Sequence, residues 1–337
     1  MNRPEPDRGN DSPSRPRSLS LVIMGTGPFA VPMFESLVDS PHRVLGLLTR
    51  LDRTVHGRSR QSAPRNPMRE VARERGIEVF EPESINSTDA HERLRSWNAD
   101  LFVVCDYGQI LSRETLALAR LGGINLHGSV LPKFRGAAPI QWAIFHGETE
   151  TGVSVIHMTP QLDAGPVLVQ RRLPIEPDET AGQLEPRLAA LGPVAVLEAI
   201  ELLAAGKIES IPQDPSQATK APRLKKKDGL VDWSRSAEEI RNQVRAMDPW
   251  PKAYTFVPRG EEQPLRIILD EVAVETIDAS MPAGTIIAAD TATGVLVVAC
   301  GRGALAITHL QPEGKRSMLS AEFLRGYPLR AGDQLGT

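Results

Sequence analysis

Cysteine is scarce in this sequence, and long hydrophobic runs are missing from it. The 337 residues include only two cysteines, Cys105 and Cys300, which form no CxxC pair. The sequence therefore excludes a disulfide-rich scaffold, gives no support for a structural zinc site, and fits a reducing, cytoplasmic compartment. No stretch approaches the roughly 18 uninterrupted apolar residues that a membrane-spanning helix needs. We therefore expect no membrane association.

A large excess of either charge is also absent. The formal net charge is −3, with 39 Lys and Arg against 42 Asp and Glu. Any contact with nucleic acid would then depend on local basic patches rather than on an overall positive charge. The hydrophobic content of 41% is ordinary for a globular protein. The length favours two domains, each with its own core.

The first 18 residues contain no apolar segment and are rich in Pro, Arg, Asp and Ser. A secretory signal requires an apolar central region, so these residues do not fit one. We expect residues 1–18 to form a solvated, disordered tail.

Short apolar runs alternate with amphipathic stretches over residues 19–205. Strands are expected at 19–24, 44–49, 77–80, 101–105, 123–127, 152–158 and 167–173, with a long closing helix at 183–205. This alternation predicts an α/β domain in which helices cover both faces of a parallel sheet. Residues 206–224 are polar and proline-punctuated, which predicts a linker. Residues 225–337 begin with a helix at 236–247 and continue as short β-rich stretches, which predicts a small barrel.

A glycine-containing turn follows the first expected strand. Residues 25–30 read GTGPFA and match the dinucleotide-binding pattern G-x-G-x-x-A. Any tight strand-to-helix turn in an α/β domain favours the same glycines, and Asp52 lies late for a ribose-binding acid. We favour a structural turn, and an NAD(P)-dependent oxidoreductase remains the alternative.

Three polar side chains are the candidate catalytic groups of the sequence. Asn125 and His127 lie two residues apart in an expected strand, so they share one face, and Asp163 lies in a Leu-Asp-Ala-Gly turn. An amide and an imidazole can donate hydrogen bonds to a developing oxyanion, and a carboxylate can tune the imidazole and relay a proton. Ser129 is not placed as a nucleophile, because Ser-Val-Leu-Pro is not a nucleophile elbow. The pattern favours direct acyl-type transfer without a covalent enzyme intermediate.

Two basic segments could contact phosphates. Residues 50–65 read RLDRTVHGRSRQSAPR, which fits either a solvated surface loop or a mobile loop that closes on a polyanion. Residues 225–227 are three consecutive lysines, for which solvated surface and phosphate contact are equally good interpretations.

Longer motifs around the candidate catalytic groups are similar to those of the 10-formyltetrahydrofolate-dependent transformylases, and most of all to the methionyl-tRNA formyltransferases. The similarity covers roughly residues 19–330 and includes Asn125-Leu-His127-Gly-Ser129-Val130-Leu131-Pro132, Arg135-Gly-Ala-Ala-Pro139-Ile-Gln141, Leu162-Asp163-Ala-Gly165, Tyr107-Gly108, Asp232-Trp233-Ser234 and Pro249-Trp250-Pro251. The separation of His127 from Asp163 also agrees with the family pattern. Two departures are Val130, where leucine is commoner, and Asp106, where a small apolar residue is common.

The resemblance implies a Rossmann-like formyltransferase domain at residues 19–205 and an OB-like, tRNA-binding domain at 225–337. It implies transfer of a formyl group from 10-formyltetrahydrofolate, a cosubstrate, to the α-amino group of methionine on initiator tRNA by a monomer. Asn125, His127 and Asp163 would be catalytic. No metal would be needed, because the N-formyl donor is already activated. The folate would contact Ser129, Val130, Leu131, Pro132, Tyr107 and Gly108. The tRNA would contact Arg53, Arg58, Arg60, Lys225 and Lys226.

Other functions remain open on the sequence alone. A related transformylase could act on a small amine, such as glycinamide ribonucleotide or an amino sugar, although the basic loop and the second domain argue against it. A formyl-folate hydrolase would use the same three residues with water as the acceptor. A non-catalytic tRNA-binding protein fits least, because the catalytic pattern is intact.

Overall fold

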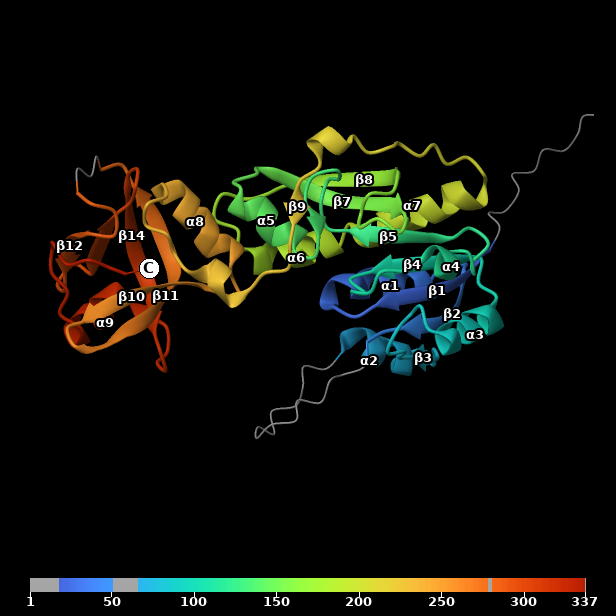
Figure 1. Cartoon of the computed structure of the whole chain (residues 1–337), viewed down its shortest axis with the longest axis horizontal. Coiled ribbons are helices and arrows are strands. Elements are labelled where there is room, and N and C mark those ends of the chain that lie inside the picture. Colours follow the sequence, from blue (N-terminus) through green and yellow to red (C-terminus); the bar gives the residue numbers. More distant parts are fainter. Residues whose placement is uncertain (1–17, 51–65, 278–280, 337) are drawn as a thin grey trace, which may run out of the picture.

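The computed structural model describes residues 18–50, 66–277 and 281–336, which form two domains side by side (Figure 1). In the described part of the first domain, one sheet contains seven strands in the order β3-β2-β1-β4-β5-β7-β8. These strands are β1 (Ser20–Gly25), β2 (Arg43–Leu48), β3 (Val79–Phe80), β4 (Leu101–Cys105), β5 (Gly123–His127), β7 (Glu150–His157) and β8 (Val167–Pro174). The expected strands are all present, with small shifts at their ends.

The sheet is mixed rather than wholly parallel. The five strands from β3 to β5 pair in parallel, as expected, whereas β5 pairs antiparallel with β7 and β7 antiparallel with β8. Antiparallel neighbours can be joined by a short connection, whereas a parallel pair needs a long crossover. The short link from β7 to β8 is therefore the turn that contains Asp163, which places this turn beside β5.

Helices cover both faces of this sheet. They are η1 (Pro28–Ala30), α1 (Val31–Val38), α2 (Pro67–Glu74), α3 (Thr88–Trp97), α4 (Arg113–Leu116), α5 (Pro139–Phe145), α6 (Ala181–Ala189) and α7 (Gly192–Ala204). Alternate side chains of β1 enter different cores: Leu21 and Ile23 pack with α1 and α7, and Val22 and Met24 pack with α3. This two-sided burial explains why β1 is apolar throughout rather than alternating.

The long helix expected at 183–205 is in fact two helices, α6 and α7. Pro193 stands at the start of α7. Its fixed φ suits the first turn of a helix, where its missing N–H leaves no hydrogen bond unmade. The apolar periodicity of the segment continues across this break, so it does not reveal the break.

The segment expected to be a linker crosses the first domain in contact with it. Ile211 exchanges backbone hydrogen bonds of 2.8 Å in each direction with Val167 of β8. After η2 (Pro215–Gln217), strand β9 (Lys220–Ala221) pairs in parallel with β6 (Arg135–Gly136). Residues 211–221 are thus tied to the loop that follows β5 and to the strand that follows the Asp163 turn.

The second domain is a curled antiparallel sheet with a helix against it. Its elements are η3 (Lys226–Gly229), α8 (Ala237–Ala246), β10 (Ala253–Arg259), β11 (Glu262–Glu275), β12 (Ile286–Asp290), β13 (Val295–Ala299), β14 (Ala304–Pro312), β15 (Met318–Leu319) and α9 (Ser320–Gly326). The strand order is β10-β11-β14-β13-β12, with β15 against β14, which makes a half-barrel of the OB-like type expected. Ser236 and Glu239 form a capping box at the start of α8.

Two tryptophans of this domain differ from each other in burial. Trp233 is 2% exposed and packs in the core. Trp250 is 51% exposed and lies outside the core. The proline residues on either side of Trp250 hold it in a turn, so hydrophobicity alone does not determine its position.

The two domains contact each other through α5 and α8 (Figure 1). Arg241 of α8 donates a hydrogen bond of 2.7 Å to the carbonyl of Pro177, and Gly182 N–H donates one of 3.1 Å to the carbonyl of Asp248. Among the described residues, no helix is long and apolar enough to cross a membrane.

Candidate active site

A cavity of about 480 Å³ opens where β4 and β5 end. Asn125, His127 and Asp163 line it together with Tyr107 and Gly108. In open α/β sheets, ligands bind at the carboxyl ends of the strands. The cavity therefore lies where this fold binds ligands, and its volume is within the range of about 300–1,000 Å³ that small-molecule sites have.

Strand β5 presents Asn125 and His127 on the same face, because side chains alternate along a strand. His127 is only 6% exposed. Its Nε2 lies 2.8 Å from the carbonyl oxygen of Phe134. A carbonyl oxygen only accepts, so Nε2 carries a proton and Nδ1 is the nitrogen that can exchange one.

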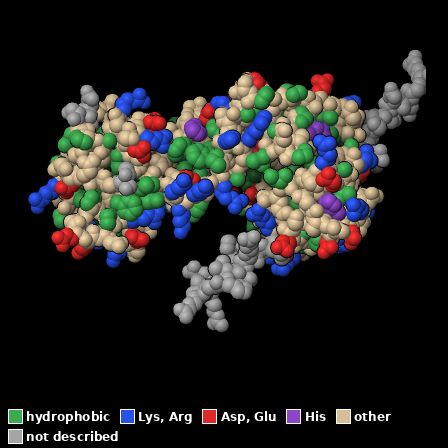
Figure 2. All heavy atoms as spheres, viewed as in Figure 1, with side chains coloured by type: hydrophobic (Ala, Val, Ile, Leu, Met, Phe, Trp, Pro, Cys, Tyr) green, Lys and Arg blue, Asp and Glu red, His purple; other side chains and the backbone are tan. Residues whose placement is uncertain are grey.

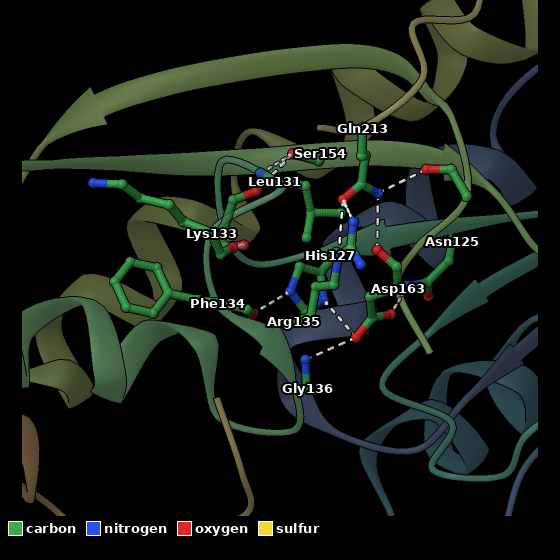
Figure 3. Close-up of polar contacts among 12 residues, drawn as sticks. Asn125, His127, Leu131, Lys133, Phe134, Arg135, Gly136, Ser154, Asp163 and Gln213 are labelled. Carbon is green, nitrogen blue, oxygen red and sulfur yellow. Dashed lines mark hydrogen bonds and ion pairs between the residues drawn. The ribbon is translucent and has the colours of Figure 1, made fainter. Parts of the chain in front are cut away.

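Asp163 connects the other groups of the site (Figure 3). Its Oδ2 accepts a hydrogen bond of 2.9 Å from Gly136 N–H and lies 3.7 Å from His127 Nδ1. Its Oδ1 accepts a hydrogen bond of 3.3 Å from Asn125 Nδ2. The structure thus brings together the three residues that the sequence singled out, although Asp163 is far from the others along the chain.

The Asp163 turn is tightly constrained. Asp163 has a φ of +48°, a left-handed conformation that Asp adopts more readily than most residues. A Cβ at Gly165 would lie 1.7 Å from the carbonyl oxygen of His157. Glycine is therefore required two residues after Asp163, which explains the Leu-Asp-Ala-Gly sequence.

The loop after β5 supplies backbone groups to the site. Phe134 contributes its carbonyl to His127, and Gly136 contributes its N–H to Asp163. Gly136 has a φ of +131°, and a Cβ there would lie 2.3 Å from the carbonyl oxygen of Ala221 in β9. Only glycine allows β6 and β9 to approach this closely.

Gln213 joins this loop to the Asp163 turn (Figure 3). Its Nε2 donates to the carbonyls of Asp163 (2.8 Å) and Gly165 (2.7 Å). Its Oε1 accepts from Nε and Nη2 of Arg135 at 3.0 and 2.7 Å. Sequence reasoning missed Gln213, because a polar, proline-rich segment gives no sign that it is held against a site.

The turn formed by residues 129–132 lies behind the cavity and does not line it. Ser129 is fully buried and donates a hydrogen bond of 2.7 Å to the carbonyl of Lys133. Leu131 N–H donates a hydrogen bond of 3.0 Å to Ser154 Oγ, and the Leu131 carbonyl accepts one of 2.8 Å from Gln170. Val130 and Pro132 are half-buried outside the lining. These residues fix the loop onto β7 and β8 instead of presenting side chains to the cavity.

Tyr107 and Gly108 do line the cavity. The ring of Tyr107 is 2% exposed, and desolvation by burial raises the pKa of its hydroxyl well above the usual range. The carbonyl of Gly108 accepts a hydrogen bond from Arg50. Nearby, Ile110 and Leu162 are 60% and 58% exposed and form an apolar rim.

Charged side chains occupy another part of the cavity wall: Asp106, Glu185 and Arg223. Desolvation raises the pKa of Asp106, while Arg50 and Arg223 lower it. Desolvation, followed by the charge of Asp106, raises the pKa of Glu185. A Cβ at Gly27 would lie 1.9 Å from Asp106 Oδ2, so this carboxyl covers the turn that resembles a dinucleotide fingerprint. A pyrophosphate would meet an acidic group at this turn, which favours the structural interpretation of the turn.

The residues expected to contact tRNA are only partly described. Arg53, Arg58 and Arg60 lie outside the described residues. Lys225 and Lys226 are exposed at the start of η3, between the domains. Figure 2 shows Lys and Arg side chains gathered around this junction. Within residues 18–50, 66–277 and 281–336, no cluster of three or more His, Cys, Asp or Glu could hold a metal ion.

An Asn and a His beside a carboxylate, at the end of a Rossmann-like sheet, make a site for group transfer through an oxyanion. The family model described as formyl transferase matches residues 18–200, and that of the formyl transferase C-terminal domain matches residues 223–328. The fold and the site together define a one-carbon transferase of this class.

Relatives define the family more closely. A methionyl-tRNA formyltransferase from Rhodopirellula baltica is 47% identical over 94% of this chain and 97% of its own length. Another from Desulfotalea psychrophila is 40% identical over 96% and 98%. The chain therefore belongs to the methionyl-tRNA formyltransferase family.

Solved structures share the fold at low identity. The N-formyltransferase from Helicobacter canadensis, at 16% identity, matches 86% of this chain and 98% of its own with a TM-score of 0.60. HypX from Aquifex aeolicus, at 18% identity, matches 92% of this chain with a TM-score of 0.58. This chain spans only 48% of the length of HypX.

Proposed function

We propose that this protein transfers the formyl group of 10-formyltetrahydrofolate to the α-amino group of methionine on initiator methionyl-tRNA. The observation that carries the proposal is the contact of Asp163 with Asn125 and with His127 at one end of the cavity. Relatives that match nearly the whole chain bear the corresponding name.

Each of the three residues has a distinct chemical task. Attack of the neutral amine on the formyl carbonyl produces a tetrahedral oxyanion, and donors aimed at this oxyanion lower the barrier. Asn125 Nδ2 would supply one of these donors. His127 would supply the other from Nδ1 when this nitrogen also carries a proton, in the imidazolium form. One proton must move from the attacking amine to the folate nitrogen that leaves, and Asp163 beside His127 is placed to relay it. The tight hydrogen bond of His127 Nε2 to Phe134 leaves Nδ1 free for this work.

The cavity suits a formyl-folate. Its volume is adequate, and the apolar rim of Ile110 and Leu162 is compatible with a flat aromatic ring system. Tyr107 and Gly108 remain our candidates for folate contact. For residues 129–132 we propose indirect support, because they hold the loop that carries Phe134 and Gly136.

We assign tRNA contact to the exposed Lys225 and Lys226 at the domain junction and to Arg53, Arg58 and Arg60 in the segment outside the described residues. Lysine and arginine pair with phosphates without regard to sequence. Both cysteines are free and buried, which is compatible with the cytoplasm, where we place this activity. We also propose that the protein acts as a monomer.

The test is formylation of methionyl initiator tRNA by the purified protein with 10-formyltetrahydrofolate, measured beside His127→Ala. His91→Ala is the matched control, because His91 lies on α3 and does not line the cavity. Formylation of the charged tRNA should be lost with His127→Ala and retained with His91→Ala.

Other acceptors separate the alternatives. Uncharged tRNA, free methionine and glycinamide ribonucleotide should not be formylated. Loss of formyl-folate without a formylated product would instead indicate a hydrolase. Transfer to a small amine but not to methionyl-tRNA would contradict the proposal.

A further inference from the structure

Residues 211–221 form a strap across the back of the active site. The strap is attached at one end by the Ile211–Val167 pairing and at the other by the pairing of β9 with β6. Between these attachments lies Gln213, whose half-buried side chain contacts both loops that supply the site.

The Gln213 amide uses its full hydrogen-bonding capacity. Both N–H groups donate to carbonyls of the Asp163 turn, and the oxygen accepts two hydrogen bonds from Arg135. An amide has two donors and one oxygen with two lone pairs, so this arrangement saturates it. A glutamate at position 213 would keep the contact with Arg135. Its carboxylate has no N–H group, however, so it could not donate to the carbonyls of Asp163 and Gly165.

The two loops that Gln213 joins meet again at the catalytic groups. Arg135 precedes Gly136, whose N–H binds the Asp163 carboxylate. Gln213 binds the backbone of Asp163 itself, at a residue with a left-handed φ. A left-handed conformation of a residue other than glycine persists when its surroundings hold it. The side-chain amide thus fixes the position of Asp163 relative to Asn125 and His127.

We infer that Gln213 is a positioning residue for formyl transfer, acting through Asp163. Gln213 is not among the residues that line the cavity, so we assign it a positioning role rather than contact with a substrate there. This inference rests on the proposed function. It assigns to Gln213, from a segment between the two domains, a part in the active site.

The test compares Gln213→Met and Gln213→Glu with Gln217→Met, all in the full chain. Gln217 is an exposed glutamine of the same strap, whose side chain donates only to Asp214 Oδ2 at 3.1 Å, among the contacts described. We expect both Gln213 variants to lower kcat by about 10- to 100-fold, because a displacement of about 1 Å at a catalytic group can cost about 10²-fold. The KM for each substrate should change less than about threefold, and Gln217→Met should match the wild type within about twofold.

A double-mutant cycle with Asp163→Asn distinguishes positioning from general support of the fold. If Gln213 acts through Asp163, Gln213→Met should lower single-turnover rates by less than about threefold in the Asp163→Asn background. The inference would be overturned if Gln213→Met lowered the rate by the same factor in the Asp163→Asn background as in the wild type. A Gln213→Glu variant with the wild-type kcat would also overturn it.

Hydrogen exchange gives a readout that does not depend on activity. In Gln213→Met, a peptide that contains the Gly136 amide should exchange faster than in the wild type, while peptides from β1 and β4 should not change. Unchanged exchange at Gly136 would overturn the inference. If the wild type failed to formylate methionyl-tRNA, the proposed function would fail, but this exchange result would still show whether Gln213 holds the two loops.

Discussion

Asp163→Asn is the substitution that tests the site most directly. It keeps the size of the side chain but replaces one acceptor oxygen with an NH₂ group. In the wild type both carboxylate oxygens accept: Oδ2 from Gly136 N–H at 2.9 Å and Oδ1 from Asn125 Nδ2 at 3.3 Å. Either orientation of the new amide therefore sets a donor against a donor.

The size of the effect follows from these contacts. Loss of one hydrogen bond to a charged group costs about 1.5–3 kcal/mol, so we expect a stability loss of about 2 kcal/mol. Catalysis should suffer more, because the proton relay is also removed. General acid–base groups contribute about 10²–10⁴-fold, so we expect kcat to fall by about 10³-fold, or about 4 kcal/mol in barrier height.

The assay is single-turnover formylation of methionyl-tRNA with enzyme in excess, beside thermal unfolding. Asp290→Asn is the matched control, because Asp290 is exposed at the end of β12 in the second domain. A rate for Asp163→Asn within tenfold of the wild type would refute the role we assign to Asp163. A normal rate with a large loss of stability would show that Asp163 acts only as a structural group.

Three further predictions concern other residues. Asn125→Ala should lower kcat, measured by steady-state kinetics, by about 10²–10³-fold, as the loss of one oxyanion donor does. An unchanged kcat would contradict the role of Asn125 as a donor to the oxyanion. Gly136→Ala should lower both activity and Tm, because its Cβ would lie 2.3 Å from the carbonyl of Ala221, and a normal Tm would contradict this packing. Hydrogen bonds from Ser236 lower the pKa of Glu239 to about 2, below its ordinary value near 4.5. Because this pKa is lower in the folded state, the ionised Glu239 stabilises the fold at pH values above its unfolded pKa, and this stabilisation is lost as the pH falls toward 2. The loss of Tm caused by Glu239→Ala should therefore become smaller on acidification. A loss of Tm that does not depend on pH would contradict the capping box.

Local sequence determined most of the elements. Strand β4 lies where its apolar run indicates, because a strand that is buried on both faces is apolar over its length. The capping box of α8 also follows from local sequence, because its two residues, Ser236 and Glu239, are three positions apart. Asn125 and His127 could be placed on one face because a strand has a fixed period.

Only the tertiary structure decided which distant groups meet. The antiparallel β7 and β8 bring Asp163 to β5, and the pairing of β9 with β6 brings Gln213 to Asp163. The tertiary structure also decided the exposure of Trp250 and the position of residues 129–132 behind the cavity. Periodicity and propensity describe neighbours along the chain, whereas these contacts depend on strand order and close approach between segments far apart in sequence. The sequence by itself therefore determined which residues we propose to carry the chemistry, and the packing of the chain determined how they are held.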